Sequence, residues 1–243
     1  GKPYLTGYII NPEKGRKTGT PKMVKKGTYA GLFTINLNGP KKADIKEVYS
    51  YWNDGSQSFI SKKGRFIENK SVAWYVGTFK DYDGNTYFTG STYRTKPRWG
   101  AAAATVVTLP TLYVPILLAG AGYTKAKELE PVIMKQNPKG ILTLDNSKQA
   151  NEQKASSGRL SFGYLTSRKY YCMPNSEKKC HYVIIDDRKD IFVYNVSQKK
   201  VVRTIPHKDG NAQINVYPAK EGYIMVSEHN QKERSTRYSI EAL

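Results

Sequence analysis

The segment "DIFVYNVSQKKVVRTI", residues 190–205, contains the clearest local signal for the fold. Two apolar runs, at 190–196 and 200–205, flank a short polar stretch that holds two lysines. Runs of this length that are rich in Val, Ile, Phe and Tyr are typical of β-strands, and a short polar break between two of them is typical of a turn. The segment therefore predicts a β-hairpin with Ser197–Lys199 at its turn.

Similar apolar runs recur on both sides of this hairpin, and turn signals such as Asn-Gly, Asp-Gly or Asn-Pro-Lys-Gly separate them about every ten residues. Several runs, such as "YVII" and "YIMV", are apolar at consecutive positions, which suits strands that are buried on both faces of stacked sheets. The sequence therefore predicts an all-β protein. Its further expected strands are 29–38, 43–52, 71–79, 85–93, 128–136, 141–145, 180–186, 212–218, 222–228 and 235–242.

Three segments, 79–91, 185–197 and 217–228, share one plan: a strand end, a polar turn and an apolar strand. Together with the predicted hairpin, this rhythm resembles the β-propeller-type repeats of uncharacterised secreted bacterial proteins. The resemblance covers about residues 29 to 242 and implies blades of four antiparallel strands over roughly 40–50 residues. No WD dipeptide or Asp-box is present, so a β-sandwich stays as the alternative.

The number of strands in this propeller-like arrangement predicts about four incomplete blades. The first blade would lack its inner strand and the last would lack its outer one. Residues 1–243 are accordingly expected to form a single all-β domain that belongs to a longer propeller.

A long uncharged stretch lies between Arg98 and Lys125, in a chain that is otherwise rich in lysine. It separates the predicted strands 85–93 and 128–136, so we expect an insertion at 97–126 between neighbouring strands of one sheet. A single membrane crossing would place these two strands on opposite sides of the bilayer, which breaks the sheet. The segment "AAAATVVTL" favours a helix that Pro110 ends, so the insertion is expected to be partly helical.

The apolar surface of this insertion must be covered. One possibility is that it folds onto its own domain. The other is that it contacts a second subunit or a membrane surface, with the centre of the contact at four apolar side chains. These are Leu112, Tyr113, Ile116 and Leu117.

The two cysteines, Cys172 and Cys180, lie on either side of a Pro-Asn-Ser turn signal. This arrangement predicts a hairpin whose arms face each other, and it favours a disulfide over free thiols. A metal site would need more ligands, and only His181 is near. A disulfide implies a periplasmic or extracellular location, although no signal peptide is visible in this chain.

The formal net charge of +19 attracts anions such as nucleic acid or lipid headgroups. The charge comes mostly from lysine, with 29 Lys against 10 Arg, and it is scattered in pairs along the chain. Scattered lysines suit turns and sheet edges, whereas a nucleic-acid groove would mix arginine with aromatic residues. Nucleic acid is therefore disfavoured as a partner.

Motifs for catalysis, metal binding or cofactor binding are missing from the sequence. No Gly-rich phosphate loop, HExxH or GxSxG is present. The segment "DYDGN" at 81–85 resembles half of a calcium loop but has no later carboxylate, so it predicts a hairpin turn. No catalytic residue, metal or cofactor is predicted. Tyr49, Tyr51 and Trp52 could form an exposed aromatic platform for a ligand, or could simply fit the strands.

The leading functional hypothesis is a non-enzymatic, extracytoplasmic binding or scaffold protein whose partner is an unknown protein or a surface glycan. One alternative is a propeller-type hydrolase with carboxylates along its axis. The other is a nucleic-acid binder that uses the basic surface.

Overall fold

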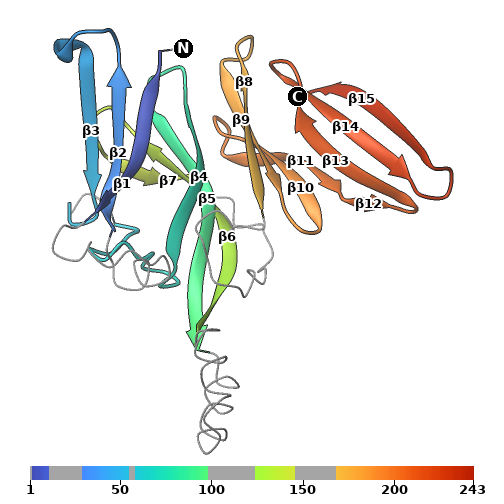
Figure 1. Cartoon of the computed structure of the whole chain (residues 1–243), viewed down its shortest axis with the longest axis horizontal. Coiled ribbons are helices and arrows are strands. Elements are labelled where there is room, and N and C mark those ends of the chain that lie inside the picture. Colours follow the sequence, from blue (N-terminus) through green and yellow to red (C-terminus); the bar gives the residue numbers. More distant parts are fainter. Residues whose placement is uncertain (1, 11–28, 55–57, 98–123, 146–167) are drawn as a thin grey trace, which may run out of the picture.

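The computed structural model describes residues 2–10, 29–54, 58–97, 124–145 and 168–243 (Figure 1). Within these ranges the chain forms β-strands and one short 3-10 turn at Lys42–Asp44. The strands build four antiparallel sheets that follow one another along the chain, and none of the described sheets closes on itself. The prediction of an all-β protein is confirmed.

Each sheet is built from strands that are consecutive in the sequence. Sheet 1 contains β1 (Tyr4–Ile10), β2 (Tyr29–Leu37) and β3 (Ile45–Tyr51). Sheet 2 contains β4 (Val72–Lys80), β5 (Thr86–Pro97), β6 (Thr124–Gln136) and β7 (Leu142–Leu144). Sheet 3 contains β8 (Lys169–Asn175), β9 (Cys180–Asp186), β10 (Asp190–Asn195) and β11 (Lys200–Pro206). Sheet 4 contains β12 (Lys208–Asp209), β13 (Ala212–Pro218), β14 (Tyr223–Asn230) and β15 (Ser235–Ala242).

The predicted hairpin at 190–205 is confirmed, because β10 pairs with β11 in antiparallel fashion. In its turn the side-chain oxygen of Asn195 accepts a hydrogen bond from the backbone N–H of Gln198 at 2.9 Å. Lys199 then takes a left-handed conformation with φ of 53°. An Asn side chain that bonds its own following backbone stabilises such a turn.

The same turn joins β8 to β9 and β14 to β15. In each case an Asn accepts a backbone N–H two or three residues later, and the fourth residue after the Asn is a Lys or Arg with positive φ. The pairs are Asn175 with Lys179, Asn195 with Lys199 and Asn230 with Arg234. This Asn-x-x-x-Lys/Arg spacing is a repeat signal that is present in the sequence and that the strand patterns alone did not reveal.

The sheets stack face to face, and sheet 2 is buried on both sides. On β6, Val132 and Met134 belong to a core shared with sheet 1, whereas Ile133 between them belongs to a core shared with sheet 3. On β9 of sheet 3, Val183 packs toward sheet 2 and Ile184 toward sheet 4. Strand alternation explains both cases. The predicted burial on two faces is confirmed for "YVII" on β9 but is wrong for "YIMV" on β14, where only Ile224 and Val226 are buried.

Strand direction repeats from sheet to sheet. The turns that follow β4 and β8 meet through a hydrogen bond from Tyr82 to Ser176, so these two strands run the same way. The end of β8 also meets the turn that follows β13, because the N–H of Gly222 donates to the carbonyl of Pro174. By contrast, β1 runs opposite to β4, since its start at Tyr4 contacts Thr78 near the end of β4.

The predicted insertion joins neighbouring antiparallel strands of one sheet, as expected, because β5 pairs with β6 up to Pro97 opposite Thr124. Residues 97 and 124–126 are strand, so the predicted boundaries of the insertion are wrong at both ends. The strands extend because their pairing continues past a register shift between Ser91 and Tyr93.

Residues 98–123 lie outside the described residues, and no helix of the predicted insertion is seen in the part of the chain that is described. The expected contact centre, Leu112, Tyr113, Ile116 and Leu117, falls in this range. In the described ranges there is no helix with the length and apolar character that crossing a bilayer requires.

Candidate functional site

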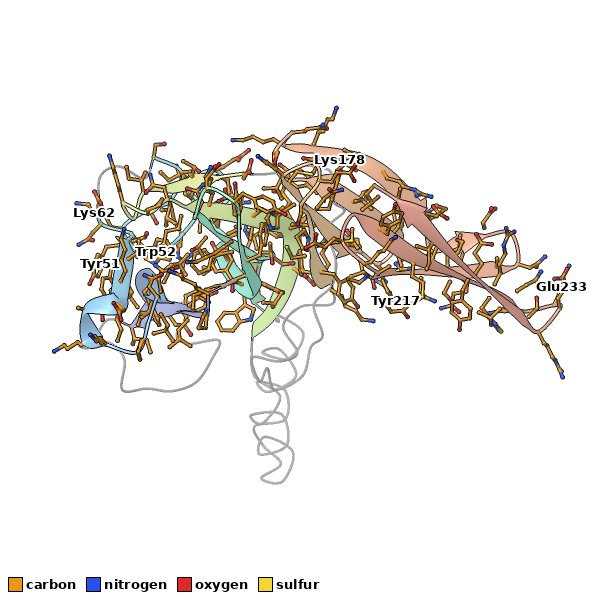
Figure 2. The ribbon with its side chains drawn as sticks, turned by 90° about the horizontal axis from the view of Figure 1, so that it is seen from above. Tyr51, Trp52, Lys62, Lys178, Tyr217 and Glu233 are labelled. Carbon is orange, nitrogen blue, oxygen red and sulfur yellow. The ribbon has the colours of Figure 1, made fainter. Side chains whose placement is uncertain are left out.

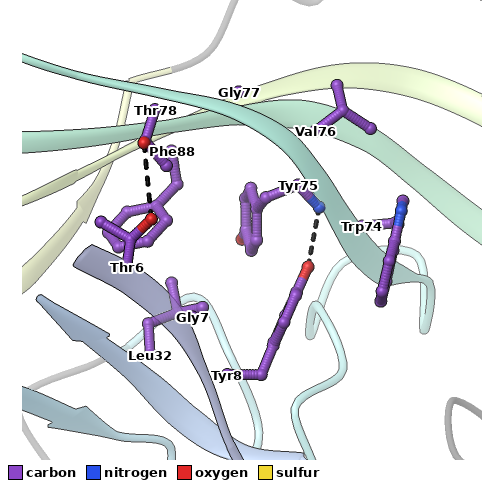
Figure 3. A pocket seen from close by; sticks show the side chains of 10 residues that line it. All are labelled: Thr6, Gly7, Tyr8, Leu32, Trp74, Tyr75, Val76, Gly77, Thr78 and Phe88. Atoms are coloured by element: carbon purple, nitrogen blue, oxygen red, sulfur yellow. Dashed lines mark hydrogen bonds between the residues drawn. The ribbon is translucent and has the colours of Figure 1, made fainter.

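A pocket of about 360 Å³ lies between sheet 1 and sheet 2 (Figure 3). Its size is within the range of small-molecule sites. Most of its lining is apolar or aromatic, with two threonine hydroxyls at one end. The lining residues are Thr6, Gly7, Tyr8 and Leu32 from sheet 1, and Trp74, Tyr75, Val76, Gly77, Thr78 and Phe88 from sheet 2.

The pocket lies where β4 has a bulge. The pairing of β4 with β5 shifts register between Tyr75 and Gly77, so Val76 has no partner in the ladder. A bulge bends its strand and redirects the side chains around it. Gly77 fits here because a Cβ at this position would come within 2.8 Å of the Thr89 hydroxyl. The pocket therefore lies beside an irregular part of β4, and Tyr75, Val76 and Gly77 of the bulge all line it.

Aromatic rings form one wall of the pocket. The Tyr8 ring stacks on Trp74 with centroids 5.2 Å apart and planes 11° from parallel. The Tyr75 ring lies 5.8 Å from Tyr8 and meets Phe88 edge-on at 5.6 Å. Such a wall offers both ring faces and ring edges to a ligand.

The polar groups of the pocket are hydroxyls. The Tyr8 oxygen accepts a hydrogen bond from the backbone N–H of Tyr75 at 2.7 Å, and the Thr6 and Thr78 hydroxyls lie 3.4 Å apart (Figure 3). The Tyr75 hydroxyl has no hydrogen-bond partner among the described residues, although this side chain is only 9% exposed. A buried hydroxyl without a partner costs about 1–3 kcal/mol, so a ligand acceptor that reached this oxygen would recover part of that cost.

Burial sets the charge state of the two phenols. It raises the pKa of Tyr75 and, as the largest of several causes, the pKa of Tyr8 well above the ordinary value for tyrosine. Both phenols therefore stay neutral near pH 7. At that pH the Tyr75 hydroxyl can donate a hydrogen bond, but neither phenol can serve as an anionic base.

The predicted aromatic platform is divided by the alternation of β3. Tyr49 and Tyr51 lie on the outer face of sheet 1, 43% and 44% exposed, with ring centroids 6.3 Å apart. Trp52 is 5% exposed and belongs to the core between sheets 1 and 2. The three residues therefore do not share one surface, because Trp52 follows Tyr51 and points the other way. Ligand binding by the two tyrosines stays a prediction.

The predicted disulfide is wrong: Cys172 is exposed and free, and Cys180 is buried and free. The hairpin itself is present as β8 and β9. Cys172 lies opposite Val183, however, and Cys180 lies opposite Asn175, which is three residues beyond Cys172. An odd offset places the two thiols on opposite faces of the sheet. The argument for an oxidising compartment is thereby removed, and an extracytoplasmic location stays a prediction.

The segment at 81–85 is a hairpin turn, as predicted. The Asp81 carboxylate accepts hydrogen bonds from the backbone N–H groups of Asp83 and Asn85 at 3.0 and 2.8 Å. Gly84 has φ of 80°, which the turn requires. In the described ranges no group of three or more His, Cys, Asp or Glu is placed to hold a metal ion.

A buried ionic cluster between sheets 2 and 3 is a second feature that the sequence patterns did not predict. The Arg168 guanidinium is fully buried and lies 3.4 Å from the Glu128 carboxylate and 3.2 Å from that of Asp187. It also donates to the carbonyl of Leu129 at 2.9 Å. The three residues come from separate segments of the chain, so no local motif could have predicted the cluster.

The pocket residues left only a weak signal in the sequence. The aromatic pair Trp74 and Tyr75 stands out, but its partner Tyr8 lies on β1, for which no strand was predicted. Comparisons of the chain with protein-family models, with curated proteins and with solved structures found no match.

Proposed function

We propose that this chain is a non-enzymatic binding or scaffold protein whose four sheets form an incomplete propeller. Successive propeller blades place equivalent strands in the same direction around one axis. The shared direction of β4, β8 and β13 supports this arrangement over a two-sheet sandwich. On this assignment β1, which runs opposite to β4, is the second strand of a blade, and the described residues of sheet 1 do not include an innermost strand.

The same assignment orders sheet 4. Since β13 matches β4 and β8 in direction, β13 to β15 correspond to the first three strands of a blade, and the two-residue β12 is an addition at the inner edge. The sequence-based expectation of a first blade without its inner strand and a last blade without its outer strand fits this proposal.

The pocket between sheets 1 and 2 is the proposed ligand site. Its ligand is a small molecule, or part of a larger one, with a planar apolar group and a hydrogen-bond acceptor. The observation that carries this proposal is the buried Tyr75 hydroxyl, which has no partner among the described residues and belongs to a side chain that lines an aromatic pocket. The aromatic wall would contact the planar group, and Tyr75 would donate to the acceptor.

The chemistry of the lining supports binding rather than catalysis. The described lining contains no carboxylate, imidazole, thiol or amine side chain. Its titratable groups are the Tyr8 and Tyr75 phenols, whose raised pKa values keep them neutral. General acid–base catalysis needs a group that titrates near the working pH. The partner class, an unknown protein or a surface glycan, stays a prediction.

Two matched probes test the site. Acetophenone has an aromatic ring and a carbonyl acceptor, whereas ethylbenzene has nearly the same shape without the acceptor. Ligand-observed NMR titration of the full chain should give a dissociation constant for acetophenone that is roughly 3- to 10-fold lower than for ethylbenzene, which is the usual net effect of one hydrogen bond.

The Tyr75→Phe variant should abolish this preference while still binding both probes. Trp74→Ala should weaken both probes together, because it removes part of the aromatic wall. Equal binding of the two probes to the wild-type chain, or an unchanged preference in Tyr75→Phe, would show that Tyr75 is not the donor and would end the proposal for this pocket.

A further inference from the structure

The stack of four sheets has two ends, and at each end one face of a sheet is not covered by another described sheet (Figure 1). The sheet-1 end face is formed by Leu5, Phe33, Ile35, Ile45, Tyr49 and Tyr51. The sheet-4 end face is formed by Tyr217, Tyr223, Met225, Tyr238 and Ile240. Figure 2 shows Tyr51 near one end of the molecule and Tyr217 in the other half, on the side of Glu233, which lies at the far end.

Strand register places these residues together on each face. In sheet 1, Phe33 lies opposite Tyr49, and the neighbouring Leu32 points the other way, into the core shared with sheet 2. In sheet 4, Met225 lies between Tyr217 on β13 and Ile240 on β15, forming a continuous cross-strand row. Each end face therefore repeats the alternation that builds the internal cores.

These faces hold much of the exposed apolar surface. Seven of the thirteen most exposed large apolar side chains in the described residues belong to them. Tyr238 and Ile240 are each 66% exposed, and Leu5 is 56% exposed. Exposed apolar groups gathered on one surface mark an interaction site, whereas isolated ones need no explanation.

Charge also separates these faces from the rest of the surface. The chain has 39 lysines and arginines, yet on β1–β3 and β13–β15 none occupies a strand position that points to an end face. Glu47 on the first face and His229 on the second are charged or titratable. At the margin of the second face, Lys208 on the short β12 lies opposite Gln213, and the Lys220 ammonium lies over the Tyr223 ring, 4.3 Å from its centroid. A sheet face that stays in water normally alternates to polar residues. The sheet-1 end face departs from this pattern at all but Glu47 of its larger side chains, whereas the sheet-4 end face carries its apolar row beside polar positions, which are Gln213, Asn215, Ser227, His229 and Thr236.

We infer that the sheet-1 end face of one copy docks onto the sheet-4 end face of a second copy of this chain. The three interfaces between the sheets of one copy support this docking, because each packs one apolar sheet face on another. Head-to-tail docking would continue the same stack of sheets from one copy to the next. Docking of like faces would leave the other end of each copy uncovered. A head-to-tail contact closes into a ring or extends as a ladder, depending on its rotation.

The size of the contact predicts a reversible association. Three strands of seven residues cover roughly 300 Å² of sheet, from the usual rise per residue and strand spacing. This is small beside a standard stable interface, so we expect a dissociation constant in the micromolar range. Because each copy has a formal charge of +19, the copies repel, and moderate salt should strengthen the association.

Sedimentation velocity of the full chain over a concentration series tests this inference. It compares the wild type with two single variants, each of which places a lysine on one of the two end faces. Tyr49→Lys breaks only the sheet-1 end face, and Ile240→Lys breaks only the sheet-4 end face. Each variant alone should associate at least about 10-fold more weakly than the wild type, since a buried unpaired charge costs more than 1.4 kcal/mol. An equimolar mixture should form a 1:1 dimer, because each variant keeps the face that the other has lost.

Val202→Lys is the matched control, because Val202 is 40% exposed on β11 and belongs to neither end face. It should leave the association unchanged. A wild-type chain that stays monomeric at about 100 μM in moderate salt, well above the expected micromolar range, would overturn the inference. Two further results would overturn it. One is a single variant that associates like the wild type, which docking of two like faces predicts for the variant whose lysine is on the unused face. The other is an equimolar mixture that forms no dimer.

Discussion

Sheet 2 meets sheet 1 on one face and sheet 3 on the other, and the two interfaces are held by different chemistry. Toward sheet 1, neutral hydrogen bonds run from Thr34 to Gln136 at 2.5 Å and from Gln136 to Ser50 at 2.7 Å. Toward sheet 3, the buried Arg168 lies between two carboxylates. The first interface also holds the aromatic pocket. One face of sheet 2 thus borders a pocket, and its other face is held to sheet 3 by buried charges.

The largest expected effect comes from breaking the ionic contact. Arg168→Met would leave the buried carboxylates of Glu128 and Asp187 without their shared cation, and it should lower the free energy of unfolding by about 3–5 kcal/mol. Urea denaturation followed by circular dichroism measures the loss. Gln136→Met is the matched change at the other interface, where the lost partners are neutral hydroxyls, so about 1–3 kcal/mol is expected. Equal losses in the two variants would contradict this distinction.

A smaller effect comes from removing one hydroxyl at each interface. The Tyr170 hydroxyl lies 2.5 Å from the Ser91 hydroxyl between sheets 2 and 3, so Tyr170→Phe should cost about 1 kcal/mol. Tyr75→Phe removes a buried hydroxyl that has no partner among the described residues, so it should leave stability unchanged or raise it slightly. Thermal unfolding of the two variants side by side decides this. A Tyr75→Phe variant as destabilised as Tyr170→Phe would mean that Tyr75 is bonded in solution.

The smallest effect concerns pH. Asp145 is 2% exposed, and burial raises its pKa above the ordinary 3.8 even though Lys199 lies 3.4 Å away. A carboxyl with a raised pKa in the folded state stabilises the fold below pH 3.8, and this contribution is lost as the pH rises through the raised value. Asp145→Asn should therefore raise the Tm at pH 7 relative to the wild type by more than it does at pH 4. A larger gain in Tm at pH 4 than at pH 7 would contradict the raised pKa of Asp145.

Local patterns predicted the strands well because strand alternation and turn residues act over a few positions. The hairpin at 190–205 and the turn at 81–85 are examples. The same local reasoning failed for Cys172 and Cys180, because the register of β8 and β9 depends on how many residues their turn uses. In that turn Asn175 fixes the pairing, and the thiols end on opposite faces.

The candidate site could not be derived in the same way, because its parts are distant in sequence. Tyr8 and Tyr75 are 67 residues apart, and the pocket that they line lies at the bulge around Val76, which no periodicity reveals. The ionic cluster has the same difficulty, since Glu128 and Arg168 come from separate segments. Residue types can be read along the chain, but which distant residues meet depends on how the sheets stack.

The central claim is that the interface between sheets 1 and 2 is a ligand site, and a crystal structure of the full chain soaked with acetophenone tests it most directly. We expect electron density for the probe in this pocket, with its oxygen within hydrogen-bond distance of the Tyr75 hydroxyl. Density for the probe only elsewhere, or a pocket filled by side chains of the chain itself, would contradict the claim.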